Sequence, residues 1–326
     1  MRNGAKRLIS LLTALAAACL LVVVPTSAAD GTVVTTLQGK DGSSSVTVTE
    51  PSGQTTVTVR LPSSVAGGAA EGGDGATLPV QGIYASQNID GAPSVTVDTS
   101  GVNGVRVNIP LDSRGAGIVA VLVEPDGTER IIRNTIPTPD GIAVRVNSGD
   151  TIKILDNSMS FTDAKGHWAA DAVDFVSARG LFRGTGANTF SPDAEMTRGM
   201  LVTVLARYAG VETAGGAAWY EKGAAWAVSN GLFDGTNLDD SITREQLVTI
   251  MYRYAGLEGK LSGAGADLCD YMDADRVSGW AADAMSWAVG AGLMEGTALA
   301  TLEPQSGATR AQVAAIIMRC AELFGL

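Results

Sequence analysis

The chain has 326 residues, of which 45% are hydrophobic and 17% are charged, and its net charge is −11. This length allows about two domains with buried cores. The single histidine, His167, excludes His-rich metal sites, and three cysteines are too few for a Cys₄ zinc site or a disulfide framework. The acidic balance argues against nucleic acid as a partner, and we expect no metal and no cofactor.

Residues 1–29 have the pattern of a secretory signal peptide. Three basic residues precede an apolar stretch over 8–24, and small residues at 25–29 offer a cleavage site. The alternative is an uncleaved membrane anchor, for which an apolar stretch of this length is short. The mature chain would keep only Cys269 and Cys320, in an exported setting where thiols can oxidise. We expect both to be reduced, or at most one bond within the last part of the chain.

Residues 30–157 predict an all-β, sandwich-like module. Short runs of β-branched residues alternate with polar ones, and Pro, Gly, Asn and Asp separate the runs. The Gly-rich stretch 62–77 has no periodicity and is interpreted as a linker. The expected strands are 46–49, 56–59, 94–97, 104–109, 118–124, 129–133, 142–146 and 151–155.

No functional site stands out in this β-module. Its one aromatic residue, Tyr84, argues against a sugar-binding platform, and it has no Gly-rich phosphate loop. We interpret it as a spacer or assembly module. An enzyme acting on wall glycan remains the alternative, because such hydrolysis needs two suitably placed carboxylates. Nothing in the sequence favours one pair among Asp90, Asp98, Asp112 and Glu124.

From residue 161 the periodicity becomes helical and the chain repeats three times. Each tryptophan of the series Trp168, Trp219 and Trp280 begins a short helical pattern that ends twelve residues later at a glycine. A glycine there suits the left-handed position that terminates a helix. The repeats are assigned to 158–212, 213–262 and 263–326. The terminating glycines are Gly180, Gly231 and Gly292.

A second helix in each repeat is predicted to begin with Thr-Arg. The threonine is a suitable N-cap, and Gln246 and Gln312 complete a capping box in repeats two and three, whereas Met200 does not in repeat one. An apolar stripe follows at helical spacing, and Cys320 falls on it, which favours a core thiol. The Thr-Arg pairs are Thr197-Arg198, Thr243-Arg244 and Thr309-Arg310.

An arginine at the first position of a helix faces the positive end of the helix dipole, which is unfavourable by roughly 0.3–1 kcal/mol. With free backbone N–H groups beside it, such an arginine forms an anion trap. Alternatively each arginine pairs with a carboxylate, such as Asp163 or Asp273, and locks the repeats together. Both roles can hold at once.

These motifs resemble the S-layer homology (SLH) domain, which runs from F-x-D through W-A and G-x-x-x-G to I-T-R-A-E. Repeat two is degenerate, because it has no F-x-D start and a shorter segment between Gly231 and Thr243. Repeat one carries the motifs as Phe161-Thr162-Asp163, His167-Trp168-Ala169, Gly180 to Gly184, Phe190-Ser191-Pro192 and Thr197-Arg198. Repeat three carries them as Tyr271-Met272-Asp273, Trp280-Ala281, Gly292 to Gly296, Leu302-Glu303-Pro304 and Thr309-Arg310-Ala311-Gln312.

The resemblance implies an all-α, three-pronged SLH triplet that binds secondary cell-wall polysaccharide, often through an acidic, pyruvylated sugar. It implies a secreted, non-catalytic protein held at the cell wall or S-layer, with the β-module displayed; lateral self-association into a lattice is a further alternative. His167 occupies the ordinary position before the tryptophan and is interpreted as a helix-start residue. The residues that the resemblance assigns to polysaccharide binding are Arg198, Arg244, Arg310, Asp163, Asp273, Trp168, Trp219, Trp280, Gly184, Gly235 and Gly296.

The three arginines are not expected to contribute equally. Arg198 and Arg310 belong to repeats that contain Asp163 and Asp273, whereas Arg244 belongs to the degenerate repeat. The sequence therefore predicts that Arg244 matters less for binding than the other two, unless a neighbouring repeat completes its groove.

Overall fold

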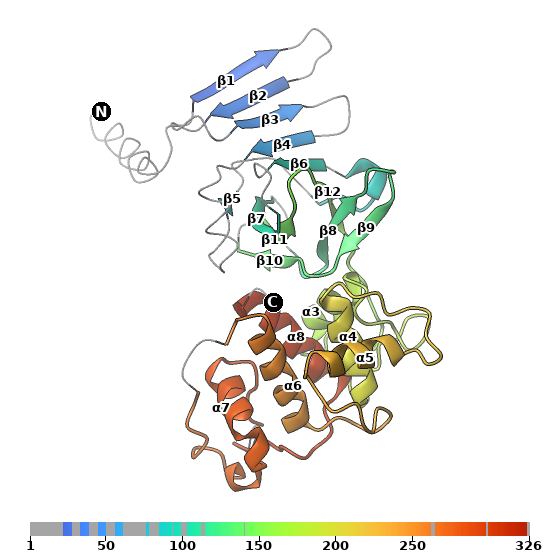
Figure 1. Ribbon diagram of the computed structural model, residues 1–326, viewed down its shortest axis with the longest axis vertical. Coiled ribbons are helices and arrows are strands. Elements are labelled where there is room, and N and C mark those ends of the chain that lie inside the picture. The colour runs from blue at the N-terminus through green and yellow to red at the C-terminus, as the bar shows by residue number, and fades with distance from the viewer. Residues whose placement is uncertain are drawn as a thin grey trace, which may run out of the picture. The chain divides into compact units, whose positions relative to one another are not determined.

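The computed structural model describes residues 85–92, 94–98, 103–111, 115–139, 141–261, 265–297 and 299–324, and the backbone of five earlier strands (Figure 1). By compactness the chain divides into two units. The first comprises the strands up to β7 with residues 120–131 and 138–156. The second comprises residues from 157 onward with the short segments 115–119 and 132–137. Among the described residues, no helix has the length and apolar composition needed to span a bilayer.

The N-terminal half forms two sheets, which confirms the predicted β-module. Pairing is antiparallel between most neighbours, but β4 pairs with β6 and β5 pairs with β7 in parallel. The larger sheet contains, in spatial order, β1 (Val22–Ser27), β2 (Val33–Gln38), β3 (Ser45–Thr49), β4 (Thr56–Arg60), β6 (Ser94–Asp98), β12 (Thr151–Asp156), β8 (Ile118–Val123) and β9 (Glu129–Ile132). The smaller contains β10 (Ile136–Thr138), β11 (Gly141–Val146), β7 (Val105–Pro110) and β5 (Ala76–Thr77).

The eight strands expected from the sequence are all present, and four others are absent from that prediction. β1 lies inside the predicted signal peptide, of which the rest lies outside the described residues. β2 has paired Val-Val and Thr-Thr residues instead of alternation, and β10 contains Pro137. β5 falls at the end of the stretch 62–77 that was interpreted as a linker; residues 62–75 lie outside the described residues.

The buried residues of β6 and β12 follow the two-residue period of a half-buried strand, whereas β8 and β11 each contain four consecutive buried residues. In β6, Val95 and Val97 are fully buried, and in β12 Ile152 and Ile154 are as well. In the smaller sheet, Val107 and Ile109 of β7 and Ile142 and Val144 of β11 are almost inaccessible. Aliphatic side chains thus make up the described core of the module.

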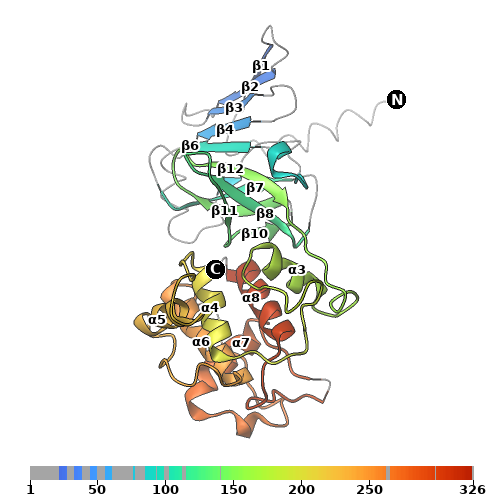
Figure 2. The same cartoon turned by 90° about the vertical axis from the view of Figure 1, so that its right-hand side faces the viewer.

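The C-terminal half contains six helices, two per repeat, as predicted. Each first helix packs on the second helix of the preceding repeat: α5 on α4, α7 on α6 and, closing the ring, α3 on α8 (Figures 1 and 2). The first helices are α3 (Ala170–Ala178), α5 (Glu221–Ser229) and α7 (Ala282–Gly290). The second helices are α4 (Arg198–Tyr208), α6 (Arg244–Leu257) and α8 (Arg310–Phe324).

Three buried residues, one before each second helix, close a ring of backbone hydrogen bonds. The N–H of Met196 donates to the carbonyl of Ala308 at 3.0 Å, Ala308 donates to Ile242 at 2.8 Å, and Ile242 donates back to Met196 at 2.8 Å. All three side chains are at most 1% exposed. Since each bond joins two different repeats, no repeat completes this ring by itself.

The predicted helix ends are confirmed in detail. Gly180, Gly231 and Gly292 have φ of +63°, +69° and +69°. In each case the residue after the glycine donates its N–H to the carbonyl five residues earlier, as Leu181 does to Val176 at 2.9 Å. This pattern ends a helix in a left-handed residue, where glycine has no side-chain penalty.

Candidate functional site

The starts of the three second helices are not free to trap an anion. In α4 the N–H of Arg198 donates to the carbonyl of Asp240 at 3.1 Å and that of Gly199 to Leu238 at 2.8 Å. The third N–H, of Met200, donates to the hydroxyl of the N-cap Thr197 at 3.2 Å. The starts of α6 and α8 are bonded in the same way. The prediction of an anion trap built from these backbone groups is therefore wrong, because neighbouring repeats occupy them.

Two of the first-position arginines join one repeat to the next. Arg244, which is 6% exposed, donates from Nε to the carbonyl of Leu302 at 2.7 Å and from Nη2 to Glu295 at 3.2 Å. Arg310 donates in the same way to the carbonyls of Phe190 and Arg183, both at 2.8 Å. Its guanidinium also lies 4.4 Å from the ring centroid of Phe190. Burial lowers the pKa of both arginines, but a guanidinium stays charged at physiological pH.

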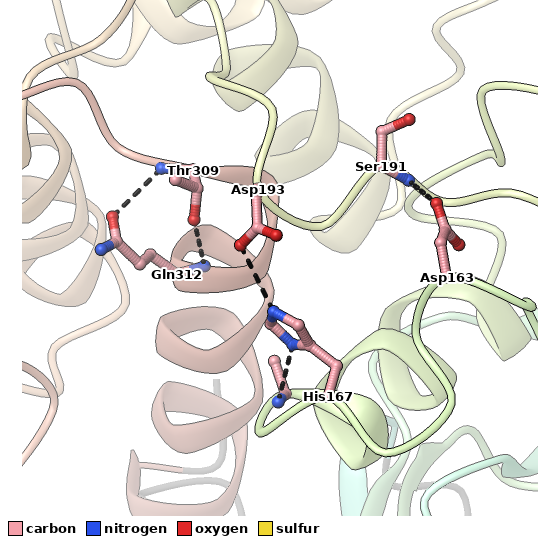
Figure 3. Close-up of polar contacts among 7 residues, drawn as sticks. Asp163, His167, Ser191, Asp193, Thr309 and Gln312 are labelled. Carbon is pink, nitrogen blue, oxygen red and sulfur yellow. Dashed lines mark hydrogen bonds and ion pairs between the residues drawn. The ribbon is translucent and has the colours of Figure 1, made fainter.

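The two aspartates of the F-x-D starts, Asp163 and Asp273, shape the loops that these arginines contact. Asp163 accepts from the N–H of Phe190 at 2.8 Å. It also accepts from the N–H of Ser191 at 2.7 Å (Figure 3). Ser191 has φ of +57°, an uncommon backbone conformation for serine that these bonds hold in place. Hydrogen bonding from Phe190 holds the pKa of Asp163 below its usual value, with a smaller contribution from Arg310.

The same arrangement occurs in repeat three. Asp273 accepts from the N–H of Leu302 at 2.7 Å and of Glu303 at 2.8 Å, and Glu303 has φ of +51°. Arg310 therefore lies on the loop held by Asp163, and Arg244 on the loop held by Asp273. The sequence groups Arg198 with Asp163 and Arg310 with Asp273 because they share a repeat, but Arg244 and Arg310 each contact the loop of the following repeat.

Arg198 is the exception among the three arginines. It is partly exposed, and its Nε donates to the side-chain oxygen of Gln246 at 3.2 Å rather than to a loop carbonyl. The loop that it faces belongs to the shortened repeat two, which has no counterpart of Asp163. In that loop Asp234 accepts from the N–H and hydroxyl of Thr236, at 2.9 and 2.8 Å. The degenerate repeat thus leaves its neighbour's arginine accessible.

This arginine lines a groove of about 340 Å³, which we call the repeat-two groove. A second arginine, Arg253 of α6, lines it too, and Trp280 of repeat three forms part of its wall. All three repeats therefore contribute to one groove. Its lining residues are Arg198, Phe233, Asp234, Thr236, Asn237, Gln246, Thr249, Ile250, Arg253 and Trp280.

A related groove of about 300 Å³, the repeat-three groove, is built from equivalent positions. Arg244 and Arg319 line it together with Trp168 of repeat one. Here the cations are more fully occupied, because Arg244 is bonded to two carbonyls and Arg319 lies 3.6 Å from Glu295. The remaining lining residues are Leu293, Met294, Glu295, Gly296, Thr297, Gln312, Ala315 and Ile316.

The helix-start tryptophans lie at the surface. Trp168, Trp219 and Trp280 are 63%, 52% and 57% exposed. The tryptophan of each groove belongs to the repeat that follows the groove's loop: Trp280 lines the repeat-two groove and Trp168 the repeat-three groove. By the same rule Trp219 corresponds to the loop of repeat one. An exposed indole beside a polar groove is an apolar wall with a polar edge.

The loop glycines have a steric reason to be glycine. A Cβ on Gly296 would lie 2.4 Å from the Tyr271 ring, and one on Gly184 would lie 2.8 Å from a carbonyl oxygen and 2.9 Å from Phe161. Gly235 has φ of +82°. These three glycines shape the loops beside the arginines. They have no side chain, so they can contact a ligand only through their backbone.

A second arginine series escaped the sequence prediction. Arg207, Arg253 and Arg319 each follow a Thr-Arg arginine by nine residues. Each donates from Nη1 to the carbonyl after its repeat's helix-ending glycine, at 2.9, 3.0 and 3.1 Å respectively. The regular spacing is visible in the sequence and would have identified them, but their place in the grooves depends on how the repeats pack.

A fully buried arginine, Arg179, also escaped prediction. It stacks 3.8 Å from the centroid of the Phe175 ring and donates to four carbonyls. Burial lowers its pKa to about 9. Since three of those carbonyls belong to the segments 115–119 and 132–137, this residue fixes these segments within the second unit.

The remaining candidates are placed as follows. His167 accepts the N–H of Ala169 at Nδ1, 3.2 Å away, and its Nε2 lies 3.4 Å from Asp193, which fits the predicted helix-start role (Figure 3). Cys269 is exposed and Cys320 is buried, and both are free thiols. Of the carboxylates considered for an enzyme, Asp112 and the side chain of Asp98 lie outside the described residues, and Glu124 pairs with Arg130 at 3.1 Å. Nothing described brings two of those carboxylates together.

Residues 160–199 and 270–314 match the S-layer homology domain family. The chain is 24% identical over 183 residues to Exoglucanase XynX of Acetivibrio thermocellus, which covers 52% of this chain and 17% of that protein. It is 26% identical over 179 residues to Amylopullulanase of Thermoanaerobacterium thermosulfurigenes, and the match covers 51% of this chain and 10% of that protein. It is 34% identical over 86 residues to Cell surface glycoprotein 1 of Acetivibrio thermocellus, and the match covers 26% of this chain and 4% of that protein. The chain thus spans at most 17% of the length of these relatives.

Proposed function

We propose that this chain, whose C-terminal half contains at least two S-layer homology domains, is a non-catalytic cell-surface protein. In this proposal the domains anchor it to the bacterial cell wall. The ligand in this proposal is the secondary cell-wall polysaccharide, bound without a covalent bond through an acidic sugar. The β-module is the part displayed at the surface.

The repeat-two groove is the observation that carries the proposal. Two guanidinium groups line it, and among the described residues neither Arg198 nor Arg253 has an ion-pair partner within 4 Å. Guanidinium groups bind carboxylates in a bidentate geometry, and Trp280 offers an apolar wall for the face of a sugar ring. An acidic sugar therefore finds both its charge and its apolar face matched in one groove.

The charge of the whole chain fits short-range recognition. A protein of net charge −11 repels an acidic polymer at a distance, so attraction must come from local donors in a groove. A contact between an arginine and a carboxylate contributes about 1.5–3 kcal/mol net. A polymer that also enters the repeat-three groove would gain from the high effective concentration of its second residue.

Binding to cell-wall sacculi tests the proposal with the full chain. We expect Arg198→Gln, Arg253→Gln and Trp280→Ala each to weaken retention by about tenfold or more, because each removes a groove contact. Arg130→Gln on β9 removes the same charge outside the helical repeats and should bind like the wild type.

Two further results would count against the proposal. If all four variants are retained on sacculi as well as the wild type, the repeat-two groove is not the binding site. Clearing of wall polysaccharide in a zymogram by the purified chain would show an enzyme instead of an anchor.

A further inference from the structure

The carboxylate of Glu245, in the first turn of α6, bonds to the start of the segment that carries Trp280. We propose that Glu245 is a positioning residue for the repeat-two groove. It fixes the Trp280 wall against the helix that supplies Arg253, so that the wall is in place before a sugar arrives. This role rests on the proposed function of that groove, and Glu245 itself does not line it.

Both carboxylate oxygens of Glu245 bond to one residue of repeat three. Oε2 accepts the N–H of Ser278 and Oε1 accepts its hydroxyl, both at 3.0 Å. Glu245 is only 4% exposed, and among the described residues it has no ion-pair partner within 4 Å. A buried carboxylate needs hydrogen-bond donors to offset its lost hydration, and Ser278 supplies two of them.

The backbone of Trp280 is held on both sides. Ser278 is the N-cap of the short 3-10 helix η3 (Gly279–Ala281), which carries the tryptophan. The carbonyl of Ser278 accepts the N–H of Ala281 at 2.8 Å, and Ala281 is fully buried. Trp280 therefore lies between a residue bonded to α6 and a residue packed in the core. Since α6 also carries Arg253, the bonds of Glu245 set the backbone of Trp280 relative to the helix that supplies this cation.

The other two repeats have no carboxylate at the position of Glu245. The residue after the Thr-Arg pair is Gly199 in repeat one and Ala311 in repeat three, and neither has a polar side chain. The helices still pack in the same way there, α5 on α4 and α3 on α8. The carboxylate is therefore not needed to build the helix pair, and its bonds serve the one tryptophan of repeat three.

A wall that is already held lowers the cost of binding a ligand. Ordering a mobile side chain on binding costs affinity, and preorganisation avoids that cost. Ala311 offers Trp168 of the repeat-three groove no such bond, because its side chain has no polar atom. An acidic sugar should therefore occupy the repeat-two groove before the repeat-three groove.

The first test needs no ligand. In the full chain labelled with fluorotryptophan, the fluorine NMR signal of Trp280 is assigned with Trp280→Phe. We expect this signal to shift or broaden in Glu245→Ala, while the signals of the other two helix-start tryptophans stay in place. Glu245→Gln keeps an acceptor oxygen for the N–H of Ser278 and should restore the signal. Glu258→Ala removes an exposed carboxylate at the other end of α6 and is the control. An unchanged Trp280 signal in Glu245→Ala would overturn the proposal.

The second test is retention of the full chain on cell-wall sacculi. We expect Glu245→Ala to weaken it by about two- to tenfold, because the ligand must then order the indole itself. Ser278→Ala loses the hydroxyl bond alone and should lie between the wild type and Glu245→Ala. The double variant Glu245→Ala with Trp280→Ala should bind like Trp280→Ala alone, since Glu245 acts through that indole. A further loss of binding in the double variant would show a general structural role and overturn the proposal.

The two tests separate this role from the proposed function. If Trp280→Ala binds sacculi like the wild type while the Trp280 signal moves in Glu245→Ala, the groove is not the polysaccharide site, yet Glu245 still positions the indole. If Trp280→Ala loses binding and Glu245→Ala changes neither readout, the groove stands and the role of Glu245 falls. A thermal melt of each variant confirms that it is folded.

Discussion

Arg244 and Leu302 belong to different repeats, yet the Nε–H of the arginine donates to the leucine carbonyl at 2.7 Å. The same loop is held from its other side by Asp273, which accepts the N–H of Leu302. Arg244 of repeat two thus bonds to a loop that belongs to repeat three. This relationship separates the arginines that hold the repeats together from the one that is accessible to a ligand.

The first prediction concerns that separation. We expect Arg244→Ala and Arg310→Ala to lower the free energy of unfolding by about 2–3 kcal/mol, since each loses charged hydrogen bonds to carbonyls that stay buried. Arg198→Ala should lower it by less than about 1 kcal/mol, because this arginine is partly exposed and bonded to a side chain. Urea unfolding of the three variants measures the difference. A larger loss for Arg198→Ala would reverse the assignment of roles.

The second prediction concerns Arg179. Replacing it by lysine should lower the free energy of unfolding by about 3–5 kcal/mol, because an ammonium group cannot reach the four carbonyls that the guanidinium satisfies. Arg276→Lys makes the same substitution in the short 3-10 helix Ala274–Arg276 of repeat three and serves as the comparison. If both variants unfold at the same urea concentration as the wild type, the buried arginine has no structural role.

The third prediction concerns the loop glycines. Gly296→Ala should cost about 1–3 kcal/mol, since its Cβ would lie 2.4 Å from the Tyr271 ring. Gly279→Ala is a matched control in the same repeat, because a Cβ there meets nothing within 4 Å. Thermal melts of the two variants should differ clearly, and similar melts would mean that the loop yields to the added methyl group.

The fourth prediction concerns pH and Asp163. Its pKa is lower in the folded chain than its ordinary value of 3.8, so its ionised form stabilises the fold above that value. The contribution is lost as the pH falls through the lower, folded pKa. The melting temperature of Asp163→Asn should therefore lie below that of the wild type at pH 7, and the gap should shrink below about pH 4. Asp283→Asn removes an exposed carboxylate of α7 and serves as the control, which should melt like the wild type at pH 7.

The fifth prediction concerns the thiols. Burial raises the pKa of Cys320, whereas hydrogen bonding and the charge of Asp267 raise the pKa of the exposed Cys269. In the folded chain a maleimide should label Cys269 and leave Cys320 unmodified, with a rate that increases as the pH rises. Mass spectrometry of the peptides checks this, and labelling of both thiols before unfolding would contradict the burial of Cys320.

The sequence by itself determines the elements and their ends. Threonine N-caps, left-handed glycines and apolar stripes act within a few residues, so they identify the two helices of each repeat and place Cys320 in the core. Alternating β-branched residues likewise identify most strands. β10 was not predicted because Pro137 interrupts the pattern, and its place at a sheet edge depends on pairing with β11.

Only the tertiary structure decides which residues of different repeats meet. The repeats close into a ring, so each arginine reaches the following loop, and a local motif that looks complete in the sequence is divided between two repeats. Repeat two, although degenerate in sequence, forms the groove in which Arg198 and Arg253 have no ion-pair partner among the described residues. Arg198 bonds to the side chain of Gln246, whereas Arg244 and Arg310 bond to loop carbonyls, and this physical difference leaves one cation available for a ligand.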